Sequence, residues 1–265
     1  MIKKIKFYFY VCTIQLYFQL AFLAKILWLQ RFSKNLSLTN LARDGVVVFE
    51  DFISPSEIQK ALEAEGFGHL TGDLSNEKDF QNVGQYFSCR SIEKLLLKKL
   101  SEKSPFSNDI RTILRKYIGK RYLSYDKGIR VLPRDEIKGE SMQPHHDSKK
   151  NRLIVYLWLS PKSRNRHPLY YLTKSHKVPK IWFNYKMTRV LSLPRKNMMA
   201  LYPDLGDLII FDSHGIHSHF KEYGLPRAVY SMNFDPVYSK RQVETLKKNL
   251  SAQEISIGDV LNYDI

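Results

Sequence analysis

The pattern of apolar and polar residues divides the chain near residue 123 into a helical front part and a part rich in short β-like runs. In the front part, the residues from Ser54 to Glu57 favour a helix start, with a serine N-cap followed by proline. Helical spacing of apolar residues predicts two more helices, at roughly Ser91–Glu102 and Asn108–Ile118. The β-branched run Val46–Phe49 predicts a strand between these helices and the N-terminus.

After residue 123 the apolar runs are short and are separated by proline, glycine and asparagine. No β-α-β alternation is visible, so we expect a β-sandwich or barrel with the front helices beside it. A chain of 265 residues with 43% hydrophobic residues is sufficient for one large domain with a packed core. The clearest strands are predicted at Arg130–Leu132, Leu153–Leu159, Leu169–Leu172, Asp207–Phe211 and Ala228–Phe234.

Residues 7–29 form a nearly continuous apolar and aromatic segment that is long enough to span a bilayer. Gln15, Gln19 and Lys25 interrupt it, and Gln15, Gln19 and Gln30 share one helical face, which suits a helix lying in the membrane interface. Two alternatives stay open at this point. The segment could be a helix packed on the globular domain, or a secretory signal peptide.

A polar stretch near Ser33–Asn40 is interpreted as a joint after the apolar segment. We therefore divide the chain into residues 1–37, an apolar helix and candidate membrane anchor, and residues 38–265, the main domain. Cys12 and Cys89 are the two cysteines, and their spacing fits neither a metal site nor a disulfide framework. This usage is compatible with a reducing compartment, and hence with a membrane-associated protein whose domain lies on the cytoplasmic side.

The formal net charge of +16 has a definite location. Between Ser148 and Pro203 there is no aspartate or glutamate, whereas the same stretch carries thirteen lysines and arginines. Such a block is either a solvated basic face or a surface that attracts an anionic partner. The anionic partners considered are a small or lipid-like substrate, for example a phosphorylated or CoA-linked one, and an anionic membrane surface. No nucleic-acid-binding motif is found.

The first candidate chemistry is the pair His145 and Asp147, two residues apart. On a strand, residues at this spacing point to the same side, so an imidazole and a carboxylate could share one metal ion. One more histidine would complete a face of two histidines and one carboxylate. That face leaves three positions on iron open for a bidentate co-substrate and oxygen.

The second candidate chemistry lies near the end of the chain. A predicted strand is followed by His214, His217 and His219, and then by a turn and a strand that Arg227 opens. An arginine across a hairpin from a metal-binding histidine suits the far carboxylate of 2-oxoglutarate, because a guanidinium matches a carboxylate in two parallel hydrogen bonds. Arg130 is the next candidate for that carboxylate.

Several segments, in this order, resemble the phytanoyl-CoA dioxygenase family of iron(II)/2-oxoglutarate oxygenases, over about residues 38–236. LARDGVVVFEDFISPSEI is similar to the N-terminal strand and helix of that family, and HHD is similar to its metal-binding His-x-Asp. LIVYLWLSP resembles the core strand that follows, and HPLYYLTKSHK resembles the next conserved segment. GDLIIFDSHGIH and LPRAVY resemble its distal metal histidine and co-substrate arginine.

The resemblance implies a mainly β fold with flanking helices, the double-stranded β-helix (jelly roll, cupin-like). It implies that His145, Asp147 and His217 hold Fe(II), with His217 rather than its two neighbours as the third ligand, and that Arg227 binds 2-oxoglutarate. The implied reaction consumes O2, converts 2-oxoglutarate to succinate and carbon dioxide, and hydroxylates an aliphatic C–H. Halogenating relatives lack the carboxylate ligand, so Asp147 favours hydroxylation.

Three nearby residues receive smaller roles. His146 should face away from its two neighbours and serve the structure, and His176 is interpreted as a loop residue near the mouth of the site. Asp212 either orients a metal ligand or caps its own turn. The alternative to an enzyme is a non-catalytic, membrane-associated binding or scaffold protein that keeps the β-helix.

Overall fold

A computed structural model describes residues 20–72, 87–119, 122–132, 144–147, 152–161, 168–178, 197–218 and 227–236. The N-terminal helix, described over residues 20–32, is followed by α2 (Leu36–Asp44), α3 (Pro55–Glu63), the 3-10 turn η1 (Gly68–Thr71), α4 (Arg90–Ser101), α5 (Pro105–Ile113), the π-turn η2 (Leu114–Ile118) and the 3-10 turn η4 (Ser175–Lys177). The strands are β1 (Val46–Phe49), β2 (Tyr122–Leu132), β3 (Leu153–Trp158), β4 (Leu169–Tyr171), β5 (Met199–Leu201), β6 (Leu208–Asp212), β7 (His217–Ser218) and β8 (Arg227–Pro236).

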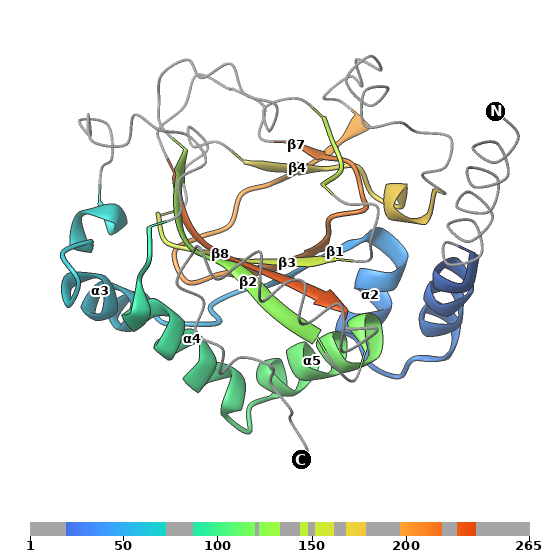
Figure 1. Ribbon diagram of the computed structural model, residues 1–265, viewed down its shortest axis with the longest axis horizontal. Helices are drawn as coiled ribbons and strands as arrows, with labels where there is room; N and C mark the ends of the chain where they lie inside the picture. The colour runs from blue at the N-terminus through green and yellow to red at the C-terminus, as the bar shows by residue number, and fades with distance from the viewer. Residues whose placement is uncertain are drawn as a thin grey trace, which may run out of the picture.

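The strands of the described residues form two antiparallel sheets. The larger has the order β1-β6-β3-β8-β2 and the smaller the order β5-β4-β7. Figure 1 shows them as facing layers, with β4 and β7 above and β8, β3 and β1 below. Strand neighbours in the larger sheet are distant in sequence, as in the pairing of Val46 with Phe211. The mainly β fold of the jelly-roll kind, with helices outside it, is confirmed.

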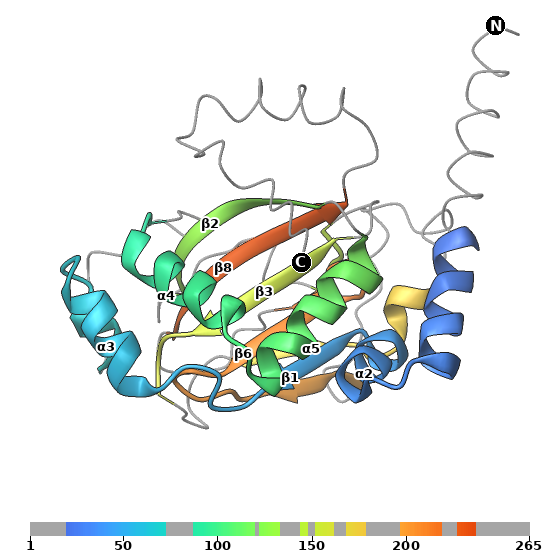
Figure 2. The same cartoon turned by 90° about the horizontal axis from the view of Figure 1, so that it is seen from below.

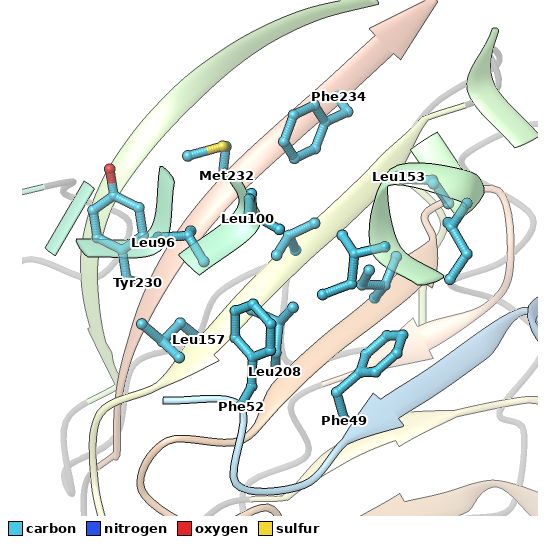
Figure 3. Packing of buried hydrophobic residues seen from close by; sticks show 14 of the residues in the cluster. Phe49, Phe52, Leu96, Leu100, Leu153, Leu157, Leu208, Tyr230, Met232 and Phe234 are labelled. Carbon is cyan, nitrogen blue, oxygen red and sulfur yellow. The ribbon is translucent and has the colours of Figure 1, made fainter. Parts of the chain in front are cut away.

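Alternation along β8 separates the two sides of the larger sheet. Ala228, Tyr230, Met232 and Phe234 belong to the main hydrophobic core, which lies between this sheet and the helices. Figure 2 shows α4 and α5 on this side of the sheet, and Figure 3 shows Tyr230, Met232 and Phe234 of β8 in one cluster with Leu96 and Leu100 of α4. The residues between them along β8 face the opposite way, toward the smaller sheet. Every residue of β8 is buried, because both of its faces are covered.

The predicted start of α3 is confirmed in detail. The Ser54 side chain accepts a hydrogen bond from the Glu57 backbone, the Glu57 side chain accepts one from the Ser54 backbone, and Pro55 is the first helical residue. Such a reciprocal cap satisfies two backbone donors that the helix itself leaves open. The third predicted helix begins earlier than expected, at Pro105, because Ser104 provides its N-cap.

The polar joint expected near Ser33–Asn40 is shorter than predicted, because residues 33–35 separate the two helices whereas residues 36–40 belong to α2. The Asn35 side chain accepts a hydrogen bond from the Leu38 backbone and so caps the helix. Leu38, Leu41 and Ala42 are then buried on one face. Their spacing of three and one is helical, and the polar residues between them occupy the outer face.

The described part of the apolar N-terminal segment packs on the domain. Phe22, Ile26 and Leu29 belong to the main hydrophobic core. The Phe22 ring meets Tyr117 edge-on, with centroids 5.8 Å apart, and the Lys25 ammonium donates to the Tyr117 carbonyl at 2.9 Å. Burial lowers the pKa of Lys25. For residues 20–29, these contacts support the alternative of a helix packed on the globular domain.

Residues 1–19, which include Gln15, Gln19 and Cys12, lie outside the described residues. Within the part of the chain that the structure describes, no helix has the length and apolar character needed to cross a membrane.

Candidate metal centre

His145, Asp147 and His217 converge on one point. The His145 Nε2 atom lies 3.2 Å from Asp147 Oδ1, and the His217 Nε2 atom lies 3.4 Å from Asp147 Oδ2. One potential ligand atom from each residue falls within 4.8 Å of the other two. Three ligands bound on one face of a metal ion at roughly 2.1 Å lie about 3 Å from one another. The three side chains therefore converge in the way that ligands of a single iron(II) ion do, and binding would shorten the widest separation, which is within 4.8 Å.

The hydrogen bond of His217 and the charge of Asp147 also suit a metal site. The His217 Nδ1 atom lies 3.0 Å from the Gly215 carbonyl, which can accept only if that nitrogen carries the proton. The Nε2 atom, which faces Asp147 Oδ2 at 3.4 Å, is then the atom that would bind a metal ion in place of a proton. Burial would raise the pKa of Asp147, but the charges and hydrogen bonds of His217 and His145 outweigh it and hold that pKa well below its usual range. The carboxylate is accordingly ionised, as a metal ligand requires.

The backbone around His145 differs from the expected strand. His145 makes an isolated antiparallel bridge with His217, in which each backbone N–H donates to the other residue's carbonyl at 2.9 Å. The Asp147 backbone N–H then donates to the Ser213 carbonyl at 3.1 Å. The carboxylate is thus placed by pairing with the loop after β6, and not by strand alternation around residue 146.

A buried aspartate organises the loop that leads to His217. The Asp212 side chain accepts from the Tyr117 hydroxyl at 2.7 Å and from the His214 backbone at 2.8 Å, and its carbonyl accepts from the Tyr171 hydroxyl at 2.9 Å. Burial, followed by the charge of Asp212, raises the pKa of both tyrosines well above the usual value, so both remain donors. Of the two roles considered for Asp212, the structure shows the cap of its own turn.

Gly215 is required where the loop crosses Tyr171. A Cβ atom at this position would collide with the Tyr171 hydroxyl. The Gly215 carbonyl also orients the His217 ring, through its contact with Nδ1. We therefore expect Gly215→Ala to lower the free energy of unfolding by about 1–3 kcal/mol, the usual cost of forcing an extra group into a packed site. Iron(II) affinity should fall with it, because the Nδ1 hydrogen bond of His217 moves.

Thermal unfolding and an anaerobic iron titration test this expectation, with Gly72→Ala as the matched control. A Cβ at Gly72 would make only ordinary contact, with the His69 carbonyl at 3.4 Å. Equal behaviour of the two alanine variants would show that the loop tolerates displacement of Tyr171.

Arg227 lies on the inner face of the larger sheet, at the start of β8. Its side chain is 1% exposed, and its guanidinium lies over the Trp158 ring with 4.8 Å to the centroid. Burial lowers the pKa of Arg227 to about 9, with smaller contributions from Tyr156, which raises it, and Arg130, which lowers it. At neutral pH the group is still protonated, so the interior of the fold holds a desolvated positive charge.

The expected hairpin between His217 and Arg227 is not what the fold contains. β7 pairs with β4 in the smaller sheet, whereas β8 pairs with β2 and β3 in the larger one. The histidine and the arginine therefore come from opposite layers and face the space between them. Strand β7 has only two residues, so its sequence shows no periodicity from which its sheet could be predicted.

Rings connect the metal site with the region around Arg227. Phe211 contacts the His217 ring at 5.1 Å and the Tyr156 ring at 5.2 Å between centroids. The Arg130 guanidinium donates to the Tyr156 hydroxyl at 3.2 Å. Phe211, Tyr156 and Arg130 lie with Trp158 on the inner face of the larger sheet, where a second hydrophobic cluster fills part of the space between the sheets. The candidate metal ligands and the two arginines, Arg130 and Arg227, therefore lie in the same space between the two sheets.

The inner face of β8 is unusually polar for a buried strand. Arg227, Ser231, Asn233 and Asp235 alternate with apolar residues and are at most 5% exposed. Asp235 pairs with Arg152 at 2.9 Å. Sequence reasoning missed this set, although the alternation of polar with apolar residues from Arg227 to Asp235 was a visible signal. Polar side chains on an inner face are suited to orienting a ligand that binds between the sheets.

The remaining candidate histidines lie apart from the triad. His146 and His214 are buried with their rings 6.2 Å apart, and neither belongs to the group that could hold a metal among the described residues. His176 lies in the η4 turn, is 2% exposed, and has its Nε2 atom 3.2 Å from the Ala42 carbonyl of α2. His219 lies outside the described residues.

Comparison with known proteins gives structural likeness only. No protein-family model matches the sequence, and no curated protein sequence matches it. EctD from S. alaskensis, solved with bound Fe, is 17% identical over 74% of each chain, with a TM-score of 0.52. The non-heme alpha ketoglutarate dependent epimerase SnoN from nogalamycin biosynthesis is 14% identical over 80% of this chain and 83% of its own, with a TM-score of 0.49.

HygX from Streptomyces hygroscopicus, solved with nickel and 2-oxoglutarate bound, is 11% identical over 76% of this chain and 87% of its own, with a TM-score of 0.49. At these identities a structural match informs about the fold. On the likeness to EctD, the chain has the mainly β, jelly-roll fold of that protein.

Proposed function

We propose that this chain is an iron(II)- and 2-oxoglutarate-dependent dioxygenase, of the kind that the phytanoyl-CoA dioxygenase family represents. The observation that carries the proposal is the convergence of His145, Asp147 and His217, with ligand atoms within 4.8 Å of one another. Two imidazoles and one carboxylate on one face of a metal ion are the ligand set of non-haem iron(II) oxygenases. EctD, which has the same fold, was solved with bound Fe.

Each of the three residues has a defined task. His145 and His217 would bind iron(II) through Nε2, and Asp147 would add the negative charge that favours a divalent ion. When bound, the iron supplies the site at which O2 is activated and 2-oxoglutarate is decarboxylated. Because the triad occupies only one face of the ion, the opposite positions stay available to co-substrate and oxygen.

Arg227 would bind the far carboxylate of 2-oxoglutarate. Its guanidinium is buried against Trp158 and burial lowers its pKa, so the interior carries a positive charge that suits a carboxylate ligand. Two parallel hydrogen bonds would fix the orientation of the co-substrate. Arg130, held at the Tyr156 hydroxyl, adds positive potential on the same face.

For the substrate we propose a small or lipid-like anionic molecule that is hydroxylated at an aliphatic C–H. The ligand Asp147 favours hydroxylation, and the thirteen basic residues between Ser148 and Pro203 favour an anion. Of these, Arg152, Lys174 and Lys177 lie in the described residues, and Arg152 and Lys177 make structural contacts there. The other ten lie outside the described residues.

The test is an anaerobic iron(II) titration of the full chain, followed by measurement of succinate after O2 is admitted. We expect about one iron per chain and succinate release that rises with the right member of a panel of acyl-CoA esters, phosphorylated sugars and acylated amino acids. Uncoupled turnover without substrate would already produce slow succinate release. Tight iron binding without succinate under any condition would instead support the binding-protein alternative.

A further inference from the structure

The N-terminal helix is apolar on two opposite faces. Its inner face, with Phe22, Ile26 and Leu29, is buried in the main core. At 100° per residue, the exposed residues of the helix cover an arc of about 140° on the other side. A surface helix normally carries polar residues opposite its buried face. Here the exposed residues are six apolar ones and one arginine: Leu20, Ala21, Ala24, Leu27, Trp28, Arg31 and Phe32.

The exposed side chains are large and contiguous. Leu20 is 50% exposed, Leu27 52%, Trp28 58% and Phe32 60%, and Leu36 at the start of α2 is 73% exposed. Figures 1 and 2 place this helix at one side of the molecule, beside α2. Water-exposed apolar surface of this extent marks an interaction site in a folded protein.

A cleft opens beside the exposed face, and its lining combines aromatic and cationic groups. The cleft has a volume of about 530 Å³ and is lined by Trp28, Phe32, Lys34 and Lys116, among others. Trp28 and Phe32 lie together, with ring centroids 6.0 Å apart. The lining, which also includes Leu29, Ser33, Asn35 and Thr112, combines two aromatic rings with two lysines, and this combination suits a molecule with acyl chains and a negatively charged head.

The charge around this face has one sign. The described residues 20–43 contain Lys25, Arg31, Lys34 and Arg43 and no aspartate or glutamate, and Arg43, at the far end of α2, pairs with Asp44. Asp109 lies near the start of α2, where its carboxylate accepts hydrogen bonds from the Asn35 and Ser37 side chains. Arg31, 5.7 Å from the Phe32 ring centroid, lies within the apolar face itself. Apolar side chains surrounded by cations complement an anionic bilayer better than an uncharged protein groove.

We propose that the exposed face of the N-terminal helix docks on an anionic lipid bilayer. Leu20, Leu27, Trp28, Phe32 and Leu36 would enter the interface, while Arg31, Lys34 and Lys116 would meet lipid phosphates. The inner face would stay on the domain, so the helix lies on the membrane without crossing it. The proposal is independent of the proposed function, because it uses no residue of the metal site or of the Arg227 region.

This surface differs from the one expected from the sequence. Three glutamines were expected to form the water-facing side of an interfacial helix. Gln30 instead accepts a hydrogen bond from the Lys177 ammonium at 2.8 Å and so faces η4. The membrane-facing side of the described helix is therefore the arc that contains Trp28 and Phe32.

The test is flotation of the full chain with vesicles of phosphatidylcholine alone or with about 30% phosphatidylserine, each at low and high salt. We expect flotation with the anionic vesicles only, reduced at high salt because surface charge is screened. The double variant Trp28→Ser/Phe32→Ser should lose more than tenfold of the bound fraction, and Lys34→Gln/Lys116→Gln should lose the salt-sensitive part. Met199→Gln, which removes a 39% exposed apolar side chain elsewhere, is the matched control and should float like the unaltered chain.

Thermal unfolding and iron titration of the same variants separate docking from folding and from the metal site. All four altered side chains are exposed or line the cleft, so both readouts should be unchanged. Flotation of the Trp28→Ser/Phe32→Ser variant at the level of the unaltered chain would overturn the proposal. So would an unaltered chain that ignores anionic vesicles and forms a dimer that this double variant abolishes, since a second copy would then cover the face.

Discussion

His217→Ala is expected to abolish tight iron(II) binding, with a loss of more than roughly 100-fold in affinity, because even partners that merely orient a ligand cost 10- to 100-fold. The triad has no spare protein ligand among the described residues, and its three potential ligand atoms already lie within 4.8 Å of one another. His145→Ala and Asp147→Ala should have the same effect. Succinate release would disappear with the metal.

The matched control is His214→Ala. His214 is as buried as His217, at 3% against 2% exposure, and belongs to the same loop, but its ring lies beside His146. Both alanine variants should lose similar thermal stability from the lost side chain, while His214→Ala keeps its iron. An anaerobic titration that found the reverse, with His214 needed and His217 dispensable, would show that the third ligand has been misassigned.

Arg227→Met is expected to weaken 2-oxoglutarate binding by about 2–5 kcal/mol, or from about 30-fold to several thousand-fold, as when one partner of a buried charge pair is lost. Methionine keeps most of the volume beside Trp158 and removes the charge. Iron(II) binding should persist, since Arg227 is not in the triad. Arg227→Lys should recover part of the affinity, because a lysine restores the charge without the two parallel hydrogen bonds.

Calorimetric titration of the iron-loaded protein with 2-oxoglutarate, under anaerobic conditions, measures this effect. Arg130→Met is the control, because Arg130 lies on the same face and donates to the Tyr156 hydroxyl. We expect it to weaken binding by less than Arg227→Met, through lost positive potential alone. A larger loss at Arg130 than at Arg227 would identify Arg130 as the residue that holds the carboxylate.

The elements that the sequence predicted well are those whose pattern is complete within the segment. The reciprocal cap at Ser54 and the runs that form β3, β6 and β8 each contain their own periodicity. The two-residue β7 and the three-residue β5 are too short to show any period, so their sheet could not be predicted. The polar joint was expected to extend to Asn40, whereas α2 begins at Leu36, because helix caps and linkers use the same residue types.

For the site, the sequence predicted which residue types are involved, and the fold determines how they meet. His145 and Asp147 were expected side by side on a strand, yet the bridge to His217 and the bond to the Ser213 carbonyl place them. The support of the loop by Tyr117 and Tyr171 through Asp212 could not be predicted, because these residues come from distant segments. A tyrosine in a helix gives no indication of the loop that it will support.

The order of strands in the larger sheet has a consequence for how the chain is made. During synthesis β1 emerges early, but its partner β6 follows only after most of the chain, since Val46 pairs with Phe211. Contacts of such long sequence separation slow folding and prolong exposure of unpaired strands. The apolar run Val46–Phe49 therefore stays without its partner strand β6 until most of the chain has been synthesised. We expect this stretch to be where nascent chains depend most on a chaperone.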